Sequence, residues 1–205
     1  MSCIAIIPAR GGSRRIPRKN FRPFMGKPIL TYSVDAAFAS GLFDMGISVS
    51  AEEADWGEIW VAAPRVGMVR RYPEYAKDEV GTQDVIRHAL QVMQRERELE
   101  RKAFGGCRPM PEIACCIYAT APTMTEADLR SGYREMIKRD DYGYIHGWFY
   151  WGFAEWFLKG RPLGEEMPRP IDRWIDINTE EDWTRAERMY QEWKATTIET
   201  KEEQA

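Results

Sequence analysis

Residues 4–20 of the chain read IAIIPARGGSRRIPRKN, and this stretch decides the fold. The apolar start at residues 4–7 is too short for a helix of ordinary length, and it runs into Gly11-Gly12-Ser13. This pattern indicates a buried strand that opens into a glycine loop. The loop carries five cationic side chains between residues 10 and 19. Adjacent glycines let backbone amides approach an anion, and Arg and Lys pair with phosphate, so the loop predicts a phosphate site. A solvated basic turn is the alternative interpretation.

The loop also matches a known pattern residue by residue. It resembles the nucleotide loop of the CMP-sialic acid synthetase family of cytidylyltransferases at residues 8–13, 15–17 and 19–20, and the similarity continues through RPFMGKPIL at residues 22–30. Arg14 stands where that family usually has Lys, which keeps the charge but exchanges a point ammonium for a planar fork. The sequence contains neither of the two common glycine-rich phosphate motifs, G-x-x-x-x-G-K-[ST] and G-x-G-x-x-G.

The resemblance implies an α/β fold, namely a Rossmann-like three-layer nucleotide-diphospho-sugar transferase fold with a mostly parallel central sheet. A chain of 205 residues can bury one good core. We therefore expect a single nucleotide-binding domain over residues 1–195 and a flexible polar tail over residues 196–205.

Hydrophobic periodicity and breaker residues predict the remaining elements. Strands are expected at residues 47–50, 59–62 and 113–118, and helices at residues 28–41, 82–102, from 126, and from 180. Gly41 is expected to end the first helix, and Thr82 and Thr179 are expected to cap two later ones. The strand at residues 47–50 should deliver its end to the same rim as the basic loop.

Composition excludes several classes of protein. The chain is 44% hydrophobic and 30% charged with a net charge of -3, so a general nucleic-acid binder is not expected. No apolar run reaches the length of a membrane span, and the charges near the start follow the apolar run, unlike a signal peptide. We expect a cytoplasmic protein with no membrane partner. Its four cysteines lack C-x-x-C spacing and are expected to be reduced and structural.

Two further stretches bear on the nucleotide. Residues 71–78, RYPEYAKD, loosely resemble a family segment whose leading arginine borders the nucleotide, which implicates Arg71. Residues 115–122, CCIYATAP, are similar to the form found in pseudaminic acid cytidylyltransferases, and this similarity implicates Ala119, Thr120 and Ala121.

Aromatic residues gather between positions 142 and 157. Residues 147–152, GWFYWG, resemble the family's G-Q-F-Y-W-G, so Trp148 and Tyr150 are candidate residues for binding the sugar substrate. Packing in the core is the alternative for so many rings. Residues 137–143 make the whole crossing from the preceding helix, where the family has a long stretch with its sugar-binding wall and dimerisation arm. The acceptor region is therefore expected to be reduced.

Residues 176–183, DINTEEDW, resemble the family's D-I-D-T-x-E-D-W, whose two aspartates hold a divalent metal. Asp176 occupies the first metal position, and Asn178 replaces the second aspartate. The implied cofactor is Mg²⁺, and a neutral amide oxygen in place of a carboxylate should weaken its binding.

The resemblance implies a nucleotidyl transfer from CTP to a nine-carbon acidic sugar, giving a CMP-sugar and pyrophosphate. Such a reaction depends on electrostatic positioning of the triphosphate, for which Arg10, Lys19 and Asp176 are the candidate catalytic residues. The candidate nucleotide-binding residues are Ala9, Arg10, Gly11, Gly12, Ser13, Arg14, Lys19, Asn20, Arg71, Ala119, Thr120 and Ala121. A homodimer that completes the acceptor pocket is one expectation. The alternative function is a nucleotide-binding sensor or interaction module that has lost transfer.

Overall fold

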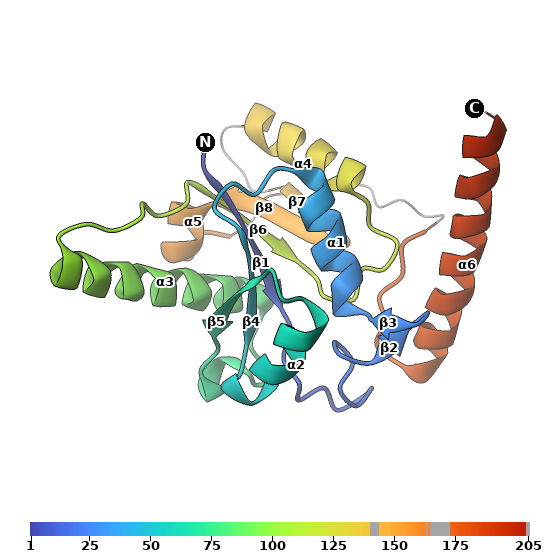
Figure 1. Cartoon of the computed structure of the whole chain (residues 1–205), viewed down its shortest axis with the longest axis horizontal. Helices are drawn as coiled ribbons and strands as arrows, with labels where there is room; N and C mark the ends of the chain where they lie inside the picture. Colours follow the sequence, from blue (N-terminus) through green and yellow to red (C-terminus); the bar gives the residue numbers. More distant parts are fainter. Residues whose placement is uncertain (140–143, 163, 165–172, 204–205) are drawn as a thin grey trace.

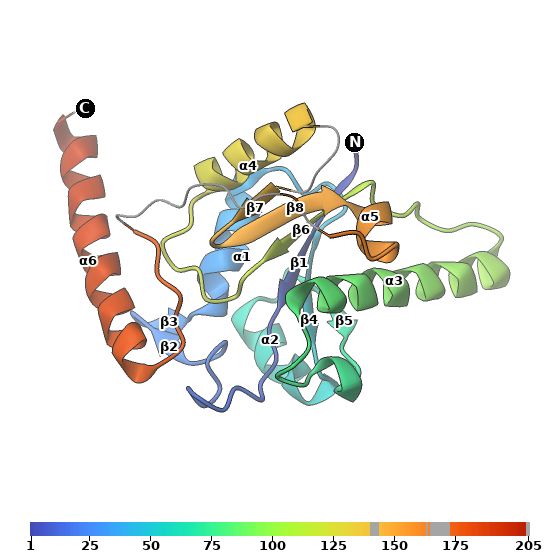
Figure 2. The same cartoon turned by 180° about the vertical axis from the view of Figure 1, so that it is seen from behind.

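The computed structural model describes residues 1–139, 144–162, 164 and 173–203. Its centre is a sheet of six strands in the order β5-β4-β1-β6-β8-β7. The strands are β1 (Cys3–Pro8), β4 (Ile47–Ala51), β5 (Gly67–Arg70), β6 (Ile113–Ile117), β7 (Tyr144–His146) and β8 (Phe149–Phe153). The four strands from β5 to β6 run parallel, and β8 and β7 complete the sheet as an antiparallel pair (Figures 1 and 2).

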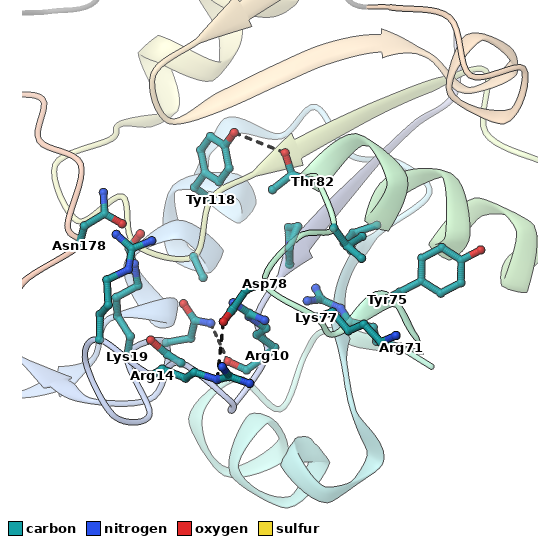
Figure 3. A pocket seen from close by; sticks show the side chains of 18 residues that line it. Arg10, Arg14, Lys19, Arg71, Tyr75, Lys77, Asp78, Thr82, Tyr118 and Asn178 are labelled. Atoms are coloured by element: carbon teal, nitrogen blue, oxygen red, sulfur yellow. Dashed lines mark hydrogen bonds and ion pairs between the residues drawn. The ribbon is translucent and has the colours of Figure 1, made fainter. Parts of the chain in front are cut away.

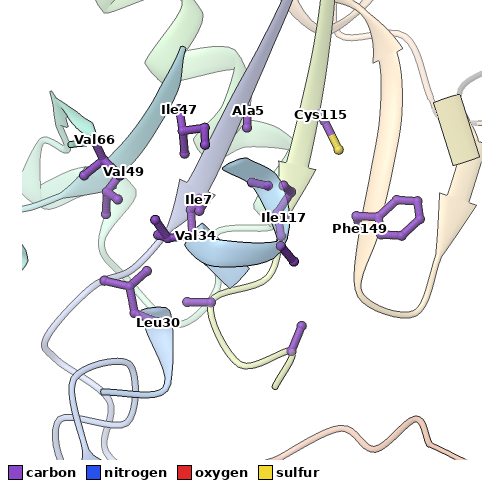
Figure 4. Close-up of a cluster of buried hydrophobic side chains, with 14 of the residues drawn as sticks. Ala5, Ile7, Leu30, Val34, Ile47, Val49, Val66, Cys115, Ile117 and Phe149 are labelled. Carbon is purple, nitrogen blue, oxygen red and sulfur yellow. The ribbon is translucent and has the colours of Figure 1, made fainter. Parts of the chain in front are cut away.

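Strand β1 lies in the middle of the sheet because both of its faces are apolar. Ala5 and Ile7 point to one face, and Ile4 and Ile6 point to the other, as expected from the period of two in a strand. Helices cover both faces, which confirms the predicted three-layer α/β fold. Figure 4 shows the first of these clusters, in which Ile7 packs with Val34 and Val49.

The helices pack in two groups. On one face α1 (Leu30–Ser40) contacts α4 (Glu126–Arg139), and on the other α3 (Thr82–Phe104) contacts α5 (Ala154–Leu158). Glycines in the left-handed conformation end two of these helices, as the sequence predicts for α1, with Gly41 at φ 65° and Gly105 at φ 73°.

Two local predictions were wrong. Residues 56–62 form α2 (Trp56–Ala62), after the short 3₁₀ turn η1 (Glu53–Asp55), and not a strand at residues 59–62. Only Ile59 of its apolar run is buried, whereas Trp60 and Val61 are 60% and 83% exposed, so the run does not form a strand core. Thr82 is the first residue of α3 rather than its N-cap, which is Gly81.

The last helix, α6 (Glu180–Glu203), stands at the edge of the molecule beside the small hairpin of β2 (Pro23–Phe24) and β3 (Lys27–Pro28) (Figure 1). Its first turns bury Trp183 against Phe24 and Tyr32. As predicted, Thr179 caps it: the Asp182 amide donates to Thr179 Oγ1 at 3.1 Å. Residues 196–203 continue this helix, so the polar tail predicted from residue 196 has helical backbone up to Glu203.

No helix within residues 1–139, 144–162 and 173–203 combines the length and the apolar character needed to cross a lipid bilayer.

Candidate functional site

A cavity of about 490 Å³ opens at the carboxyl ends of β1 and β6, where parallel strands commonly place a ligand site (Figure 3). It gathers nine of the predicted residues from four parts of the chain. These are Arg10, Ser13, Arg14, Lys19, Asn20, Arg71, Ala119, Thr120 and Asn178. Six cationic side chains line the cavity, four from the loop and two from the segment after β5, so the cavity attracts anions.

An internal carboxylate occupies part of this cationic wall. Asp78 accepts a hydrogen bond from Arg10 Nη2, and its other oxygen lies 3.6 Å from Arg14 Nε (Figure 3). Arg10 also donates to the carbonyl of Ala76. The hydrogen bond from Arg10 is the main reason that the pKa of Asp78 lies below its usual range. Asp78 therefore holds the position that an anionic ligand would take beside these two arginines.

Lys19 links the loop to the far side of the cavity. Its ammonium donates to the carbonyl of Ile177 at 2.5 Å, which places it beside Asn178. Burial lowers the pKa of Lys19, while the nearby carboxylate of Asp176 acts in the opposite direction. The ammonium is thus a partly desolvated donor close to the segment that carries the predicted metal ligands.

Arg71 lies at the back of the cavity and is 4% exposed. Its guanidinium donates to the carbonyl of Ser50 at 2.7 Å and to the hydroxyl of the same residue at 3.3 Å. Burial, and then the nearby charge of Arg10, lower the pKa of Arg71 to about 10. It remains a cation at neutral pH, fixed to the end of β4.

The backbone amide of Gly11 does not face the cavity, contrary to the role that the sequence suggests for it. It donates to Asp55 Oδ2 at 2.7 Å, and Asp55 Oδ1 accepts from Arg18 at 2.7 Å. A Cβ atom at residue 11 would lie 2.2 Å from both Asp55 and Arg18, so this close approach requires glycine. Gly12 is exposed, and a Cβ atom there would meet open space.

Two other predicted nucleotide residues lie in the core instead of the cavity lining. Ala9 and Ala121 are both fully buried, and the amide of Ala9 donates to the carbonyl of Ser50 at 3.0 Å. Asn20, by contrast, lines the cavity and donates to the carbonyl of Arg10 at 2.9 Å, which fixes the loop that carries the first arginine.

Sequence reasoning missed half of the lining. The additional residues are Pro8, Arg15, Tyr75, Lys77, Asp78, Val80, Thr82, Val85 and Tyr118. Tyr118 and Thr82 form an uncharged polar end, where their hydroxyl oxygens lie 3.5 Å apart. Position alone could have identified Tyr118, since it follows β6 directly and precedes Ala119. Asp78 stands in the stretch that implicates Arg71, but no pattern marked it as a partner of the loop.

Trp148 and Tyr150, the predicted sugar-binding residues, are core residues, and each is 2% exposed. Trp148 lies under the guanidinium of Arg173 at 4.9 Å and packs with the helices on one face. Tyr150 belongs to β8 and packs in the core cluster on the other face of the sheet, where burial strongly raises its pKa. Trp148, in the turn between β7 and β8, and Tyr150, on β8, are thus both explained by packing in the core.

Asp176 and Asn178, the predicted metal ligands, lie side by side, and of the two Asn178 lines the cavity whereas Asp176 does not. The Asn178 amide donates to Asp176 Oδ2 at 2.7 Å, and the Asp176 side chain is exposed. Within the described part of the chain, no group of three or more His, Cys, Asp or Glu side chains could hold a metal by itself. One carboxylate and one amide oxygen do suit Mg²⁺, which commonly takes its remaining ligands from water and substrate phosphates.

Comparison with known proteins identifies the family. A family described as cytidylyltransferase matches residues 4–147. The pseudaminic acid cytidylyltransferase of Campylobacter jejuni is 31% identical over 138 residues, which are 67% of this chain and 54% of that protein. The N-acylneuraminate cytidylyltransferase of Streptococcus agalactiae is 37% identical over 91 residues, 44% of this chain and 22% of that protein. The matched part of the chain therefore spans about half the length of the first relative and about a fifth of the second.

Among solved structures, the protein Rv0371c from Mycobacterium tuberculosis superposes with a TM-score of 0.62 at 16% identity, covering 91% of this chain and 97% of that one. Another structure of Rv0371c is a complex with manganese. At this identity the likeness concerns the fold alone.

Proposed function

The chain belongs to the cytidylyltransferase family, and we propose that it transfers a cytidylyl group from CTP to a nine-carbon acidic sugar. The observation that carries the proposal is the cavity at the end of β1, where Arg10, Arg14 and Lys19 meet Arg71 and Thr120. These four cations around one space suit the charge of a triphosphate, and two of the relatives, a pseudaminic acid and an N-acylneuraminate cytidylyltransferase, are named for sugar acids of that class.

In this proposal the chain's own residues act by position. Arg10 and Arg14 bind the phosphates after these displace Asp78, and Lys19 binds from the opposite side through its ammonium. Asp55 keeps the loop folded before the nucleotide arrives, because it already satisfies the amide of Gly11 and the charge of Arg18. Preorganised cations lose little energy to rearrangement when charge develops in the transition state.

The proposed reaction is an in-line displacement. The anomeric hydroxyl oxygen of the sugar bonds to the α-phosphorus of CTP, the bond from that phosphorus to the bridging oxygen breaks, and pyrophosphate leaves. The hydroxyl proton passes to solvent. Such a step needs correct alignment and charge neutralisation far more than covalent help from the protein.

Asp176 and Asn178 would hold the divalent cation, which we propose to be Mg²⁺. When bound, it neutralises part of the triphosphate charge. Lys19 would keep both residues at the cavity, because its hydrogen bond to Ile177 fixes the backbone between them. The single carboxylate predicts weaker metal binding than a pair of carboxylates would give.

The acceptor sugar would enter at the uncharged end of the cavity, beside Thr82 and Tyr118. The buried positions of Trp148 and Tyr150 leave this end without the aromatic wall suggested by the sequence. We propose that a second copy of the chain completes this region as a homodimer. The use of CTP suits a cytoplasmic location.

A second candidate is nucleotide binding without transfer. The replacement of the second metal carboxylate by Asn178, together with the burial of both predicted sugar residues, favours it. A pyrophosphate-release assay with CTP, Mg²⁺ and either pseudaminic or sialic acid separates the two functions. Sugar-dependent release supports transfer. A flat trace with both sugars, alongside CTP binding in calorimetry, supports the second candidate, and absence of CTP binding contradicts both.

A further inference from the structure

Asp176 and Asn178 lie on a strap, residues 173–179, that has no regular secondary structure. The strap leads into α6, and its side chains alternate: Ile175 and Ile177 are buried with Trp183, whereas Asp176 is exposed. An irregular segment can rotate about its own axis more easily than a strand paired in a sheet. Asn178, which lines the cavity, and Asp176 beside it keep their positions only if both ends of the strap are held.

The end of the strap that joins α6 is held by Asp182 and Lys19. The carboxylate of Asp182 accepts hydrogen bonds from the amides of Asn178 and Thr179, at 3.0 and 2.9 Å. Lys19 binds the carbonyl of Ile177 from the loop. These contacts fix the strap where it joins α6.

The other end is held by Arg173, which does not line the cavity. Its guanidinium donates to both oxygens of Asp128, at 2.8 and 2.6 Å, and to the carbonyl of Thr123 at 3.0 Å. The Thr123 hydroxyl donates back to the carbonyl of Arg173 at 2.5 Å. A bidentate pair fixes direction as well as distance, so both the backbone and the side chain of Arg173 are oriented.

Asp128 is itself rigidly placed. It lies in the first turn of α4, and its carboxylate accepts hydrogen bonds from the amide and the hydroxyl of Thr125, at 2.8 and 2.7 Å. The ion pair is largely shielded from water, with side-chain exposures of 18% for Arg173 and 13% for Asp128. Burial raises the pKa of Asp128, but the hydrogen bonds from Arg173 and Thr125 outweigh it, so the net pKa is lowered and the carboxyl stays ionised.

We propose that Asp128 is a positioning residue for the metal-binding strap: through Arg173 it holds residues 173–179 so that Asp176 and Asn178 present their oxygens at the cavity. Arg173 stands three positions before Asp176, a span of at most about 10 Å, so a change at the anchor is transmitted directly to the metal ligands. The inference rests on the proposed function, because it assigns the strap to a nucleotide-bound cation. Residues that orient metal ligands without touching the metal have this kind of role in other sites.

The test compares Asp128→Asn with Glu155→Gln, which removes a carboxylate from an exposed ion pair on α5. Calorimetry measures CTP affinity with Mg²⁺ and with a chelator. We expect Asp128→Asn to reduce the gain in affinity that Mg²⁺ provides by about tenfold, and to leave the metal-free affinity almost unchanged. Glu155→Gln should change neither. Arg173→Lys keeps the charge but loses the bidentate geometry, and it should reproduce part of the loss.

A purely structural role would lower the affinity equally with and without metal, and this result would overturn the proposal, as would an unchanged Mg²⁺ effect. Hydrogen exchange gives a second measurement that needs no nucleotide. Amides 174–178 should exchange faster in Asp128→Asn and Arg173→Lys than in Glu155→Gln, and equal rates would also overturn the proposal. If the unchanged protein failed to bind CTP, the proposed function would fall, and the exchange rates would still decide whether Asp128 holds the strap.

Discussion

Two carboxylates hold the cationic loop, Asp55 and Asp78, and they differ mainly in burial. Asp55, with a side chain 4% exposed, binds the amide of Gly11 and the guanidinium of Arg18. Asp78, 45% exposed, binds Arg10 and approaches Arg14 at the cavity. Removing a partner from a buried pair leaves uncompensated polar groups, whereas an exposed pair contributes little. The first contact therefore belongs to the fold, and the second is one that a phosphate can replace.

The comparison predicts its largest effect at the buried carboxylate. Asp55→Ala leaves the Gly11 amide without its acceptor and removes one partner of Arg18, so the free energy of unfolding should fall by about 3 kcal/mol. Urea denaturation measures this change. Glu58→Ala removes the exposed partner of the same arginine and should change stability very little. Equal losses of unfolding free energy in the two variants would show that burial does not determine how much each carboxylate contributes to stability.

Lys19→Ala should give the next largest effect, on binding instead of folding. Its ammonium lines the cavity and donates to the strap at Ile177, and the loss of one hydrogen bond to a charged phosphate should weaken CTP binding about thirtyfold, or about 2 kcal/mol. Calorimetry with CTP measures the affinity. Lys27→Ala is the matched control, since Lys27 pairs with Asp35 and lines a different cavity. A loss of unfolding free energy as large as the loss of binding free energy would contradict this assignment.

Much of the buried core that holds the loop in place could be predicted, because the inner strands follow from hydrophobic periodicity. The apolar run at residues 4–7 had to form an inner strand, and parallel strands end at one rim, so the loop, Ser50 and Thr120 were expected to meet. The position of Asp55 could not be predicted. It lies 44 residues from Gly11, and no local pattern distinguishes it from the other acidic residues at positions 52, 53 and 58.

The aromatic residues show where prediction from sequence failed, because a motif suggested a binding role for residues that are buried in the core. Tyr150 matches a family motif, and Trp148 stands in that motif where the family has Gln, yet so many rings also suit a packed core, and both side chains are buried. Similarly, the apolar run Ile59-Trp60-Val61 suggested a strand, but exposed apolar side chains on a short helix have the same composition. Sequence identifies which residues are apolar, and tertiary packing decides which of them are covered.

A second carboxylate on the strap would sharpen the contrast. Asn178→Asp places a second anion beside Asp176, where the present amide donates a hydrogen bond to the carboxylate at 2.7 Å. Two adjacent carboxylates bind a hard cation more tightly, so the Mg²⁺ concentration for half-maximal CTP binding should fall about fivefold. Asp176→Asn should shift it in the other direction. An unchanged metal titration in both variants would separate these residues from any metal.

The smallest expected effect is at the exposed carboxylate, and it is an increase in affinity. Asp78→Asn removes the anion that competes for Arg10 and Arg14, so CTP should bind about threefold more tightly at low salt, with the advantage declining as salt screens the pair. Glu79→Gln changes the net charge equally at a neighbouring position outside the cavity lining. An equal gain in the two variants would mean that general charge, and not displacement of Asp78, governs entry of the triphosphate. A gain confined to Asp78→Asn would mean that the loop is held in its binding conformation by a carboxylate that stands where a phosphate will bind.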